Sequence, residues 1–155
     1  MKLKPRAAVS AVLLAFVAVS LVYLVVKELR APRAAAPGAA LENGLVVYYF
    51  HGTARCRTCN RIEALTRAAL EGHFSPELES GRILMLSLNR EKPGNAGYVE
   101  DFGLASNSVV VVEFRDGRRR RWKNLKRIWE LVADESAFTG YIAEEVRAAG
   151  SGAQR

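Results

Sequence analysis

Uncharged and apolar residues occur in two kinds of segment along this chain. The first is a run without any charged side chain at residues 7–26. A helix of that length, rising about 1.5 Å per residue, matches the roughly 30 Å hydrocarbon core of a membrane. The second kind is short and rich in β-branched and aromatic residues, which is typical of buried strands. These short runs are residues 45–50, 83–88 and 109–114.

Between the short runs, apolar residues recur at the spacing of amphipathic helices. The helices predicted in this way run from Cys59 to about Glu71, over 97–102, over 125–132 and around 138–146. Asp116-Gly117 favours a tight hairpin that returns through residues 118–122. The order predicts an α/β fold, in which a parallel strand pair with its crossover helix is followed by an antiparallel hairpin. The result is a four-stranded mixed sheet flanked by helices.

Composition divides the chain into four regions. We expect one N-terminal transmembrane helix as an anchor within 1–30, a flexible linker at 31–44 rich in proline, glycine and alanine, a folded domain at 45–150 and a disordered tail at 151–155. The alternative for the first region is a cleavable signal peptide, with a cleavage site at the three alanines 34–36. The apolar run exceeds the usual core of about 7 to 15 residues, and charged residues separate it from that site. These features favour an uncleaved anchor in the cell membrane.

The charge balance bears on both location and partners. The formal net charge is +7. Residues 1–44 hold six basic and two acidic side chains, a charge of +4, which leaves +3 for the remainder. Much of the basic character therefore belongs to the anchor and linker, and we expect no nucleic-acid partner. The positive-inside rule favours an extracytoplasmic domain, where a disulfide can persist.

The candidate chemistry lies in Cys56 and Cys59, the two cysteines of the chain, at the start of a predicted helix. The positive end of a helix dipole lowers the pKa of a nearby thiol, and Arg55 and Arg57 add positive charge beside Cys56. Cys59 turns inward on the same helix face. A zinc site needs about four ligands, and the two histidines match no zinc-finger spacing. We therefore expect dithiol–disulfide exchange without a cofactor or metal ion, with soft-metal or arsenic binding as the alternative.

The order of elements, with C-x-x-C at the first strand-to-helix junction, resembles the thioredoxin fold. More narrowly, the chain is similar to small bacterial thioredoxin-like proteins described as a nitrophenyl compound nitroreductase subunit linked to arsenic operons. The residues that carry this narrower resemblance are 48–56 (YYFHGTARC), 62–66 (IEALT) and 122–125 (WKNL). The resemblance implies that Cys56 attacks a partner disulfide and that Cys59 resolves the mixed disulfide.

The chain departs from thioredoxins at two places. Thioredoxins carry a cis-proline in the substrate-docking loop, where this chain has Ser106, Asn107 and Ser108. They also carry a buried acid on the first strand, which here is Val-Val-Tyr-Tyr-Phe. His51 is a candidate replacement for that acid as the proton acceptor of Cys59, and equally an ordinary polar residue at the end of a strand.

The sequence therefore predicts a membrane-anchored thiol–disulfide oxidoreductase. Its expected partner is a protein disulfide or dithiol, such as a nitroreductase or a membrane reductant. Two other functions stay open at this point. One is a module that binds a soft metal or arsenic through the cysteine pair, and the other is a non-catalytic membrane subunit that docks a nitroreductase.

Overall fold

The computed structural model describes residues 13–23 and 41–151, which belong to two separate compact units. In the first unit, residues 13–23 form a helix whose large apolar side chains are exposed. Within 13–23 and 41–151, no helix combines the length and the apolar character needed to cross a membrane. The expected anchor at 7–26 extends outside these described residues at both ends, so it stays a prediction.

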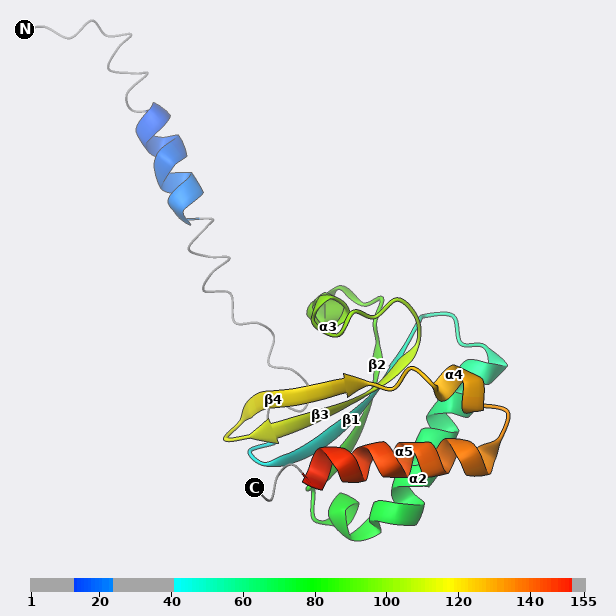
Figure 1. The fold of residues 1–155 in the computed structure, drawn as a ribbon. Coiled ribbons are helices and arrows are strands. Elements are labelled where there is room, and N and C mark those ends of the chain that lie inside the picture. The colour runs from blue at the N-terminus through cyan, green and yellow to red at the C-terminus, as the bar shows by residue number, and fades with distance from the viewer. Residues whose placement is uncertain (1–12, 24–40, 152–155) are drawn as a thin grey trace, which may run out of the picture. The chain divides into compact units, whose positions relative to one another are not determined.

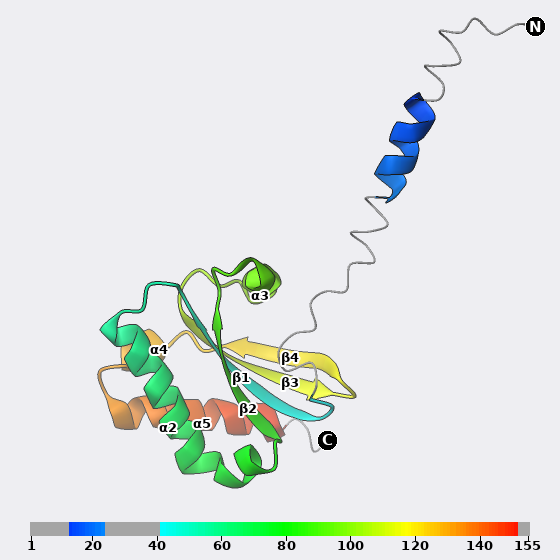
Figure 2. The ribbon, with the colours of Figure 1, turned by 180° about the vertical axis from the view of Figure 1, so that it is seen from behind.

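The second unit is built on one four-stranded sheet, as predicted (Figures 1 and 2). Its strands lie in the order β2-β1-β3-β4. β1 pairs in parallel with β2 and antiparallel with β3, and β3 forms an antiparallel hairpin with β4. The strands are β1 (Gly44–His51), β2 (Ile83–Asn89), β3 (Ser108–Arg115) and β4 (Arg118–Asn124). These connections are the ones that a thioredoxin-like fold implies.

Helices cover both faces of the sheet. α2 (Arg57–Glu79) and α5 (Glu135–Ser151) pack on one face, and α3 (Ala96–Phe102) packs on the other (Figures 1 and 2). Two short helices complete the domain, η1 (Pro93–Asn95) and α4 (Ile128–Leu131).

The central strand β1 has apolar side chains on both faces, so helices must cover both faces of the sheet. Its apolar residues alternate between the two cores because successive side chains point to opposite faces. Leu45, Val47 and Tyr49 face α2 and α5. The intervening Val46, Tyr48 and Phe50 face α3. Tyr48, Tyr49 and Phe50 are each at most 1% exposed, so the end of the strand that leads to the cysteines is fully buried.

Three helices differ from the prediction in their bounds, and the last of them, α5, extends beyond the expected 138–146 at both ends. α2 continues past the expected stop near Gly72 and ends at Glu79. The chain instead kinks at Phe74 (φ −141°, ψ 28°), and a second helical segment begins around Pro76, where proline suits a first turn. The helix predicted over 125–132 is restricted to α4, because the backbone N–H of Leu125 donates to the carbonyl of Val109 and keeps that residue beside the sheet.

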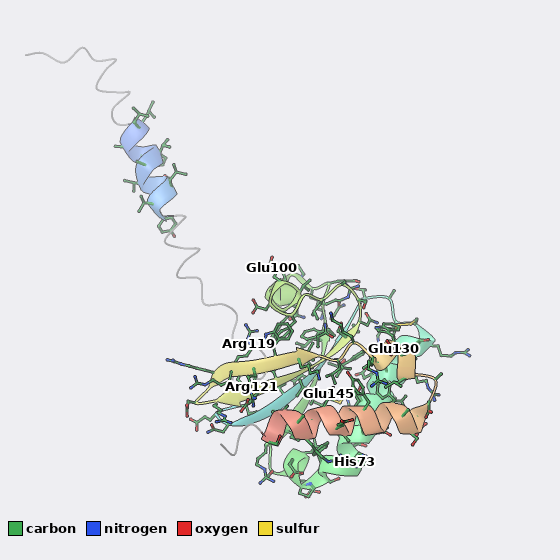
Figure 3. The ribbon with its side chains drawn as sticks, viewed as in Figure 1. His73, Glu100, Arg119, Arg121, Glu130 and Glu145 are labelled. Carbon is green, nitrogen blue, oxygen red and sulfur yellow. A yellow bond between two sulfur atoms is a disulfide. The ribbon has the colours of Figure 1, made fainter. Side chains whose placement is uncertain are left out.

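The β3–β4 hairpin forms at Asp116-Gly117, where both residues have positive φ (53° and 67°). That backbone suits the tight hairpin turn predicted from the sequence. β4 is an edge strand with four exposed arginines, 118–121, and Figure 3 shows two of them, Arg119 and Arg121. Three of the four have an acidic partner: Arg119 with Asp101, Arg120 with Asp116 and Arg121 with Glu113.

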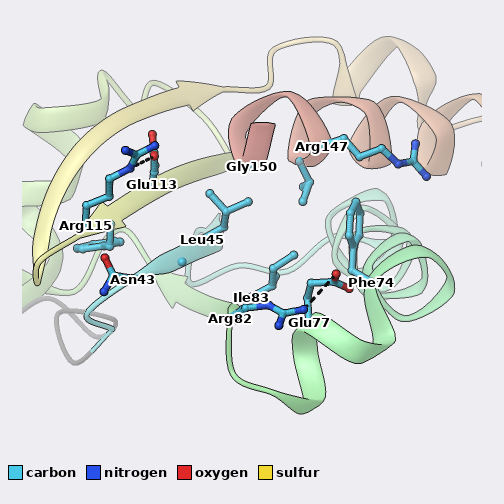
Figure 4. Close-up of a pocket in the computed structure, with 13 residues that line it drawn as sticks. Asn43, Leu45, Phe74, Glu77, Arg82, Ile83, Glu113, Arg115, Arg147 and Gly150 are labelled. Carbon is cyan, nitrogen blue, oxygen red and sulfur yellow. Dashed lines mark hydrogen bonds and ion pairs between the residues drawn. The ribbon is translucent and has the colours of Figure 1, made fainter. Parts of the chain in front are cut away.

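Glu113 is the buried acid of this hairpin, with 3% of its surface exposed. One of its carboxylate oxygens accepts a hydrogen bond from Arg115 Nε at 2.6 Å (Figure 4). The other accepts one from Arg121 Nε at 2.8 Å. Burial opposes ionisation, but the two guanidinium groups outweigh it and hold the pKa of Glu113 below its usual value. These two ionic hydrogen bonds thus offset the free-energy cost of burying the Glu113 charge near the edge of the sheet.

We predict that Glu113→Gln lowers the free energy of unfolding by about 1–3 kcal/mol at neutral pH, because both arginines lose a charged acceptor. The folded-state pKa is depressed, so the carboxylate stabilises the protein above its unfolded pKa of about 4.3 and this contribution is lost as the pH falls. Urea denaturation at neutral and acidic pH measures both effects. Glu77→Gln, which breaks the half-exposed pair with Arg82, is the control. An equal loss in the two variants contradicts the prediction.

Candidate functional site

The cysteine pair lies at the junction of β1 and α2. Cys56 is the N-cap residue of α2, with an extended backbone (φ −82°, ψ 165°), and it forms a disulfide with Cys59. Cys56 is exposed, whereas Cys59 is only 6% exposed. The structure therefore separates the two sulfurs as predicted, with one accessible to a partner and one shielded by the core.

The sulfur of Cys56 also serves as the helix cap. The backbone N–H of Cys59 donates to Cys56 Sγ at 3.0 Å, so the sulfur satisfies one of the N–H groups that a helix start leaves unpaired. The first turn of α2 contains no acidic residue. A negative charge on this sulfur would therefore be stabilised by the N–H group and by the positive end of the helix dipole.

The two arginines beside Cys56 are not equivalent. Arg55 forms an ion pair with Glu63, and its guanidinium lies 5.9 Å from the centre of the Tyr49 ring. Arg57 is exposed, and none of the ion pairs found within the described part of the chain includes it. In the disulfide form, the positive charge of Arg55 is therefore compensated and that of Arg57 is not.

Glu63 is a site residue that the sequence analysis did not single out. It lies one helical turn after Cys59, and its side chain is 19% exposed. Burial raises the pKa of this carboxyl, but hydrogen bonds from Arg55 and Ser87, together with the nearby charges of Arg55 and His51, lower it below its usual value. Its spacing of four residues from Cys59 is the signal that was available, because such residues share a helix face.

Tyr49 is a second residue that sequence reasoning missed. Its hydroxyl donates to the backbone carbonyl of Cys59 at 2.7 Å, although the residue is fully buried. Burial raises the pKa of Tyr49, with the charge of Arg55 acting in the opposite direction. The Tyr49 side chain therefore links strand β1 to the shielded cysteine on α2.

His51, predicted as a candidate base, is half-buried at the end of β1. Its Nδ1 lies 2.8 Å from the carbonyl oxygen of Gly52. Its charge acts on Glu63 and Glu91, and lowers the pKa of both carboxyls. His51 is thus part of the charged surroundings of Glu63. In the described ranges 13–23 and 41–151, no three histidine, cysteine or acidic side chains gather as a metal site.

The loop predicted to dock substrate lies next to the cysteine loop. The Oδ1 atom of Asn107 accepts a hydrogen bond of 3.0 Å from the backbone N–H of Gly52. The same side chain also acts on the Tyr49 hydroxyl and opposes the effect of burial, which still raises the pKa of the tyrosine overall. One asparagine thus connects the loop before Cys56 to the residue that holds Cys59.

The backbone of this loop has a further partner. Trp129, which is 42% exposed, donates from Nε1 to the carbonyl of Asn107 at 3.1 Å. The hydroxyl of Ser108 donates to the carbonyl of Ser106 at 3.1 Å. No peptide bond of the described residues is cis. The Asn107 side chain and the Trp129 indole therefore hold this loop beside the loop before Cys56.

A cavity of about 760 Å³ lies at the far end of the domain (Figure 4). It is lined by Gly44 and Leu45 at the start of β1, whereas the cysteines follow the end of that strand. Two of its charged residues already have partners, since Arg82 pairs with Glu77 and Arg115 pairs with Glu113. The cavity is therefore separate from the cysteine site.

Similarity to known proteins is found among solved structures. No protein family and no curated protein matches the sequence. Among solved structures, the chain is similar to thioredoxin O2 from Arabidopsis thaliana in its oxidised state, at 12% identity and a TM-score of 0.38, over 72% of this chain and 87% of that one. It is also similar to a malarial protein at 15% identity and a TM-score of 0.36, over 60% of this chain and 98% of the other. At such scores, the thioredoxin-like description rests on strand order, connections and the position of the cysteines.

We predict that Asn107→Ala lowers the free energy of unfolding by about 1–2 kcal/mol, because the buried N–H of Gly52 loses its acceptor. Asn107→Asp keeps an oxygen acceptor for that N–H, so its effect should be smaller. Ser106→Ala in the same loop is the control. Chemical denaturation measures the three variants, and equal stability of Asn107→Ala and Ser106→Ala contradicts the prediction.

Proposed function

We propose that this protein is a thiol–disulfide oxidoreductase in which Cys56 attacks and Cys59 resolves. The observation that carries the proposal is the N–H···Sγ hydrogen bond from Cys59 to Cys56 at the start of α2, with Cys56 exposed and Cys59 buried. Such an arrangement favours a thiolate on the accessible sulfur and protects the second thiol from outside partners.

The reaction needs no cofactor. The Cys56 thiolate attacks one sulfur of a partner disulfide, a Cys56–partner disulfide forms, and the other partner sulfur leaves as a thiolate. Cys59 then loses its proton and attacks Cys56 Sγ, which closes the Cys56–Cys59 disulfide and releases the second partner thiolate. Two electrons pass to the partner. The same steps in reverse oxidise a partner dithiol, so the partner's potential sets the direction.

The location and the partner are also part of the proposal. The uncharged run at 7–26 would anchor the chain in the cell membrane, with the domain outside the cytoplasm. The partner would be a protein disulfide or dithiol, such as a membrane reductant or, following the narrower family resemblance, a nitroreductase. In the two alternatives, the cysteines bind a soft metal or arsenic, or the domain only docks a nitroreductase.

A cysteine substitution separates these functions. We predict that Cys59→Ala accumulates a mixed disulfide through Cys56, because the thiolate that completes the exchange is missing. The adduct should remain intact in non-reducing electrophoresis and should be cleaved by reductant. Mass spectrometry of the adduct should then identify the partner. Cys56→Ala is the matched variant and should trap little, since Cys59 is shielded.

The alternatives give different results in the same pair of variants. A metal-binding module loses bound metal in both variants and forms no covalent adduct in either. A docking subunit keeps its nitroreductase bound in both. Absence of a reductant-sensitive adduct in Cys59→Ala, together with no redox cycling of the wild-type pair, contradicts the oxidoreductase proposal.

The membrane topology gives a further prediction. A C-terminal fusion to a reporter that is active only outside the cytoplasm should be active, and the mature chain should retain residues 1–36. The matched fusion carries a reporter that is active only in the cytoplasm, and it should be silent. Activity of the cytoplasmic reporter refutes the orientation, and loss of residues 1–36 refutes the uncleaved anchor.

A further inference from the structure

The net positive charge of the folded domain is concentrated in the β3–β4 hairpin. Residues 45–155 hold 17 basic and 14 acidic side chains, a charge of +3. The hairpin segment 113–121 holds five arginines and two acids, so its own charge is also +3. The other residues of 45–155, with 12 basic and 12 acidic side chains, are neutral as a group. Such a separation of charge favours a partner with a negative surface.

Two arginines near the tip of the hairpin keep their charge available to a partner. Arg118 is exposed and takes part in none of the ion pairs found within 13–23 and 41–151. Arg120 pairs with Asp116 at 3.4 Å, but these side chains are 52% and 79% exposed, so solvent screens the pair and its contribution is small. Arg119 and Arg121 are held by shorter ion pairs of 2.8 Å.

The register of β4 leaves the same two arginines without an acid directly opposite. Arg118 lies opposite Arg115, which is another cation. The register shift between Glu113 and Phe114 leaves Arg120 with no residue opposite it. Like charges that face each other across two strands are destabilising. An anion from outside the domain would offset that repulsion at the tip.

The tip is also fixed to the segment through which the chain enters the domain. The backbone N–H of Gly117 donates to the carbonyl of Glu42 at 3.0 Å, and that of Asp116 donates to Oδ1 of Asn43 at 3.3 Å. The uncharged run ends at residue 26, and the chain from there to residue 42 can reach at most about 55 Å. A membrane anchor at 7–26 would therefore keep the hairpin within reach of the membrane surface.

The cysteine site lies at the opposite end of the sheet. Gly44 pairs with Phe114 near the hairpin tip, whereas Phe50 pairs with Ser108 at the other end of β1, shortly before the cysteines. A strand of eight residues extends about 25 Å. Figures 1 and 2 show the hairpin tip and the start of α2 at opposite ends of the domain. A membrane contact at the tip would therefore turn Cys56 away from the lipid.

We propose, as an inference that rests on the anchoring part of the proposed function, that Arg118 and Arg120 dock the domain on anionic headgroups of the membrane that holds the chain. Each basic residue close to an anionic surface shifts such an equilibrium by about fivefold, and salt screens the attraction. The docked domain holds Cys56 on the side remote from the membrane. This orientation favours a soluble partner, or a membrane partner whose cysteines project by about the length of β1.

Energy transfer in lipid nanodiscs measures the height of the cysteine site in the full-length chain. The chain has two cysteines, so a maleimide dye attaches to Cys56 alone in Cys59→Ala. A small fraction of headgroup-labelled lipid supplies the acceptor dye. We expect less transfer in phosphatidylglycerol nanodiscs than in phosphatidylcholine nanodiscs, because docking lifts Cys56 from the surface. The difference should disappear at about 1 M salt, where the Debye length is about 3 Å.

A pair of arginine substitutions tests the docking residues themselves. Arg118→Gln combined with Arg120→Gln should shift the docking equilibrium by about 25-fold and so remove most of the lipid effect. The matched control combines Arg67→Gln with Lys126→Gln, which removes two exposed cations elsewhere on the domain. This control should keep the lipid effect. Neither pair breaks a buried contact, so both variants should fold as the wild type does.

Failure of the anchor and failure of the inference give different results. A chain that does not insert into nanodiscs refutes the anchor, and docking is then measured by flotation. In that case, more of the wild type than of the double arginine variant should float with phosphatidylglycerol vesicles. Equal flotation of the two would contradict the docking. Loss of thiol–disulfide exchange leaves the energy transfer unchanged, because the readout needs only the dye on Cys56.

Two results in nanodiscs would overturn the inference. The first is wild-type transfer that is equal or higher in phosphatidylglycerol than in phosphatidylcholine. Self-association of the double arginine variant would then indicate that the arginines only protect the edge strand, and loss of partner binding would indicate an acidic protein segment as the ligand. The second is a lipid effect of the same size in the double arginine variant and in the control.

Discussion

The hydrogen bond from the Cys59 N–H to Cys56 Sγ is the interaction on which the rest of the site depends. It makes the sulfur of Cys56 the cap of α2, so that the start of the helix and the position of the reactive atom are the same feature. The fully buried strand β1 supports it, since Tyr49 on that strand donates to the carbonyl of Cys59. Strand β1 thus fixes the start of α2, and the start of α2 fixes the position of the Cys56 sulfur.

The site differs from a plain C-x-x-C motif in how its neighbours are arranged. Asn107 accepts a hydrogen bond from the backbone N–H of Gly52, in the loop before Cys56. Glu63, one helical turn after Cys59, forms an ion pair with Arg55. Both arrangements rely on hydrogen bonds and charge. These respond to pH and to the redox state of the cysteines more directly than backbone stiffness does.

Much of the fold could be predicted from the sequence because its strands are unusually clear. The run at 45–50 is buried on both faces and became β1 (Gly44–His51), and Asp116-Gly117 placed the hairpin. The end of α2 could not be predicted, because a glycine suggested a stop at Gly72 while packing of Phe74 into the core carries the helix onward through a kink.

The candidate site could be predicted only where local sequence defines it. Cys56 and Cys59 follow from their spacing and from the strand-to-helix junction, and the structure gives them the expected difference in exposure. The role of Asn107 could not be predicted, because it requires β3 to pair beside β1 and bring residues 52 and 107 together. The ion pair of Glu63 could not be predicted either, since only the folded loop brings Arg55 to it.

The most direct test of the central claim is a redox titration of the wild-type chain in which free thiols are alkylated and counted by mass. Stabilisation of the Cys56 thiolate by the helix start and by Arg57 favours the reduced pair. The account therefore predicts that both cysteines gain alkyl groups together, in one two-electron transition, at a potential above thioredoxin's value of about −270 mV. A transition at or below that value, or cysteines that become alkylated independently of each other, would contradict it.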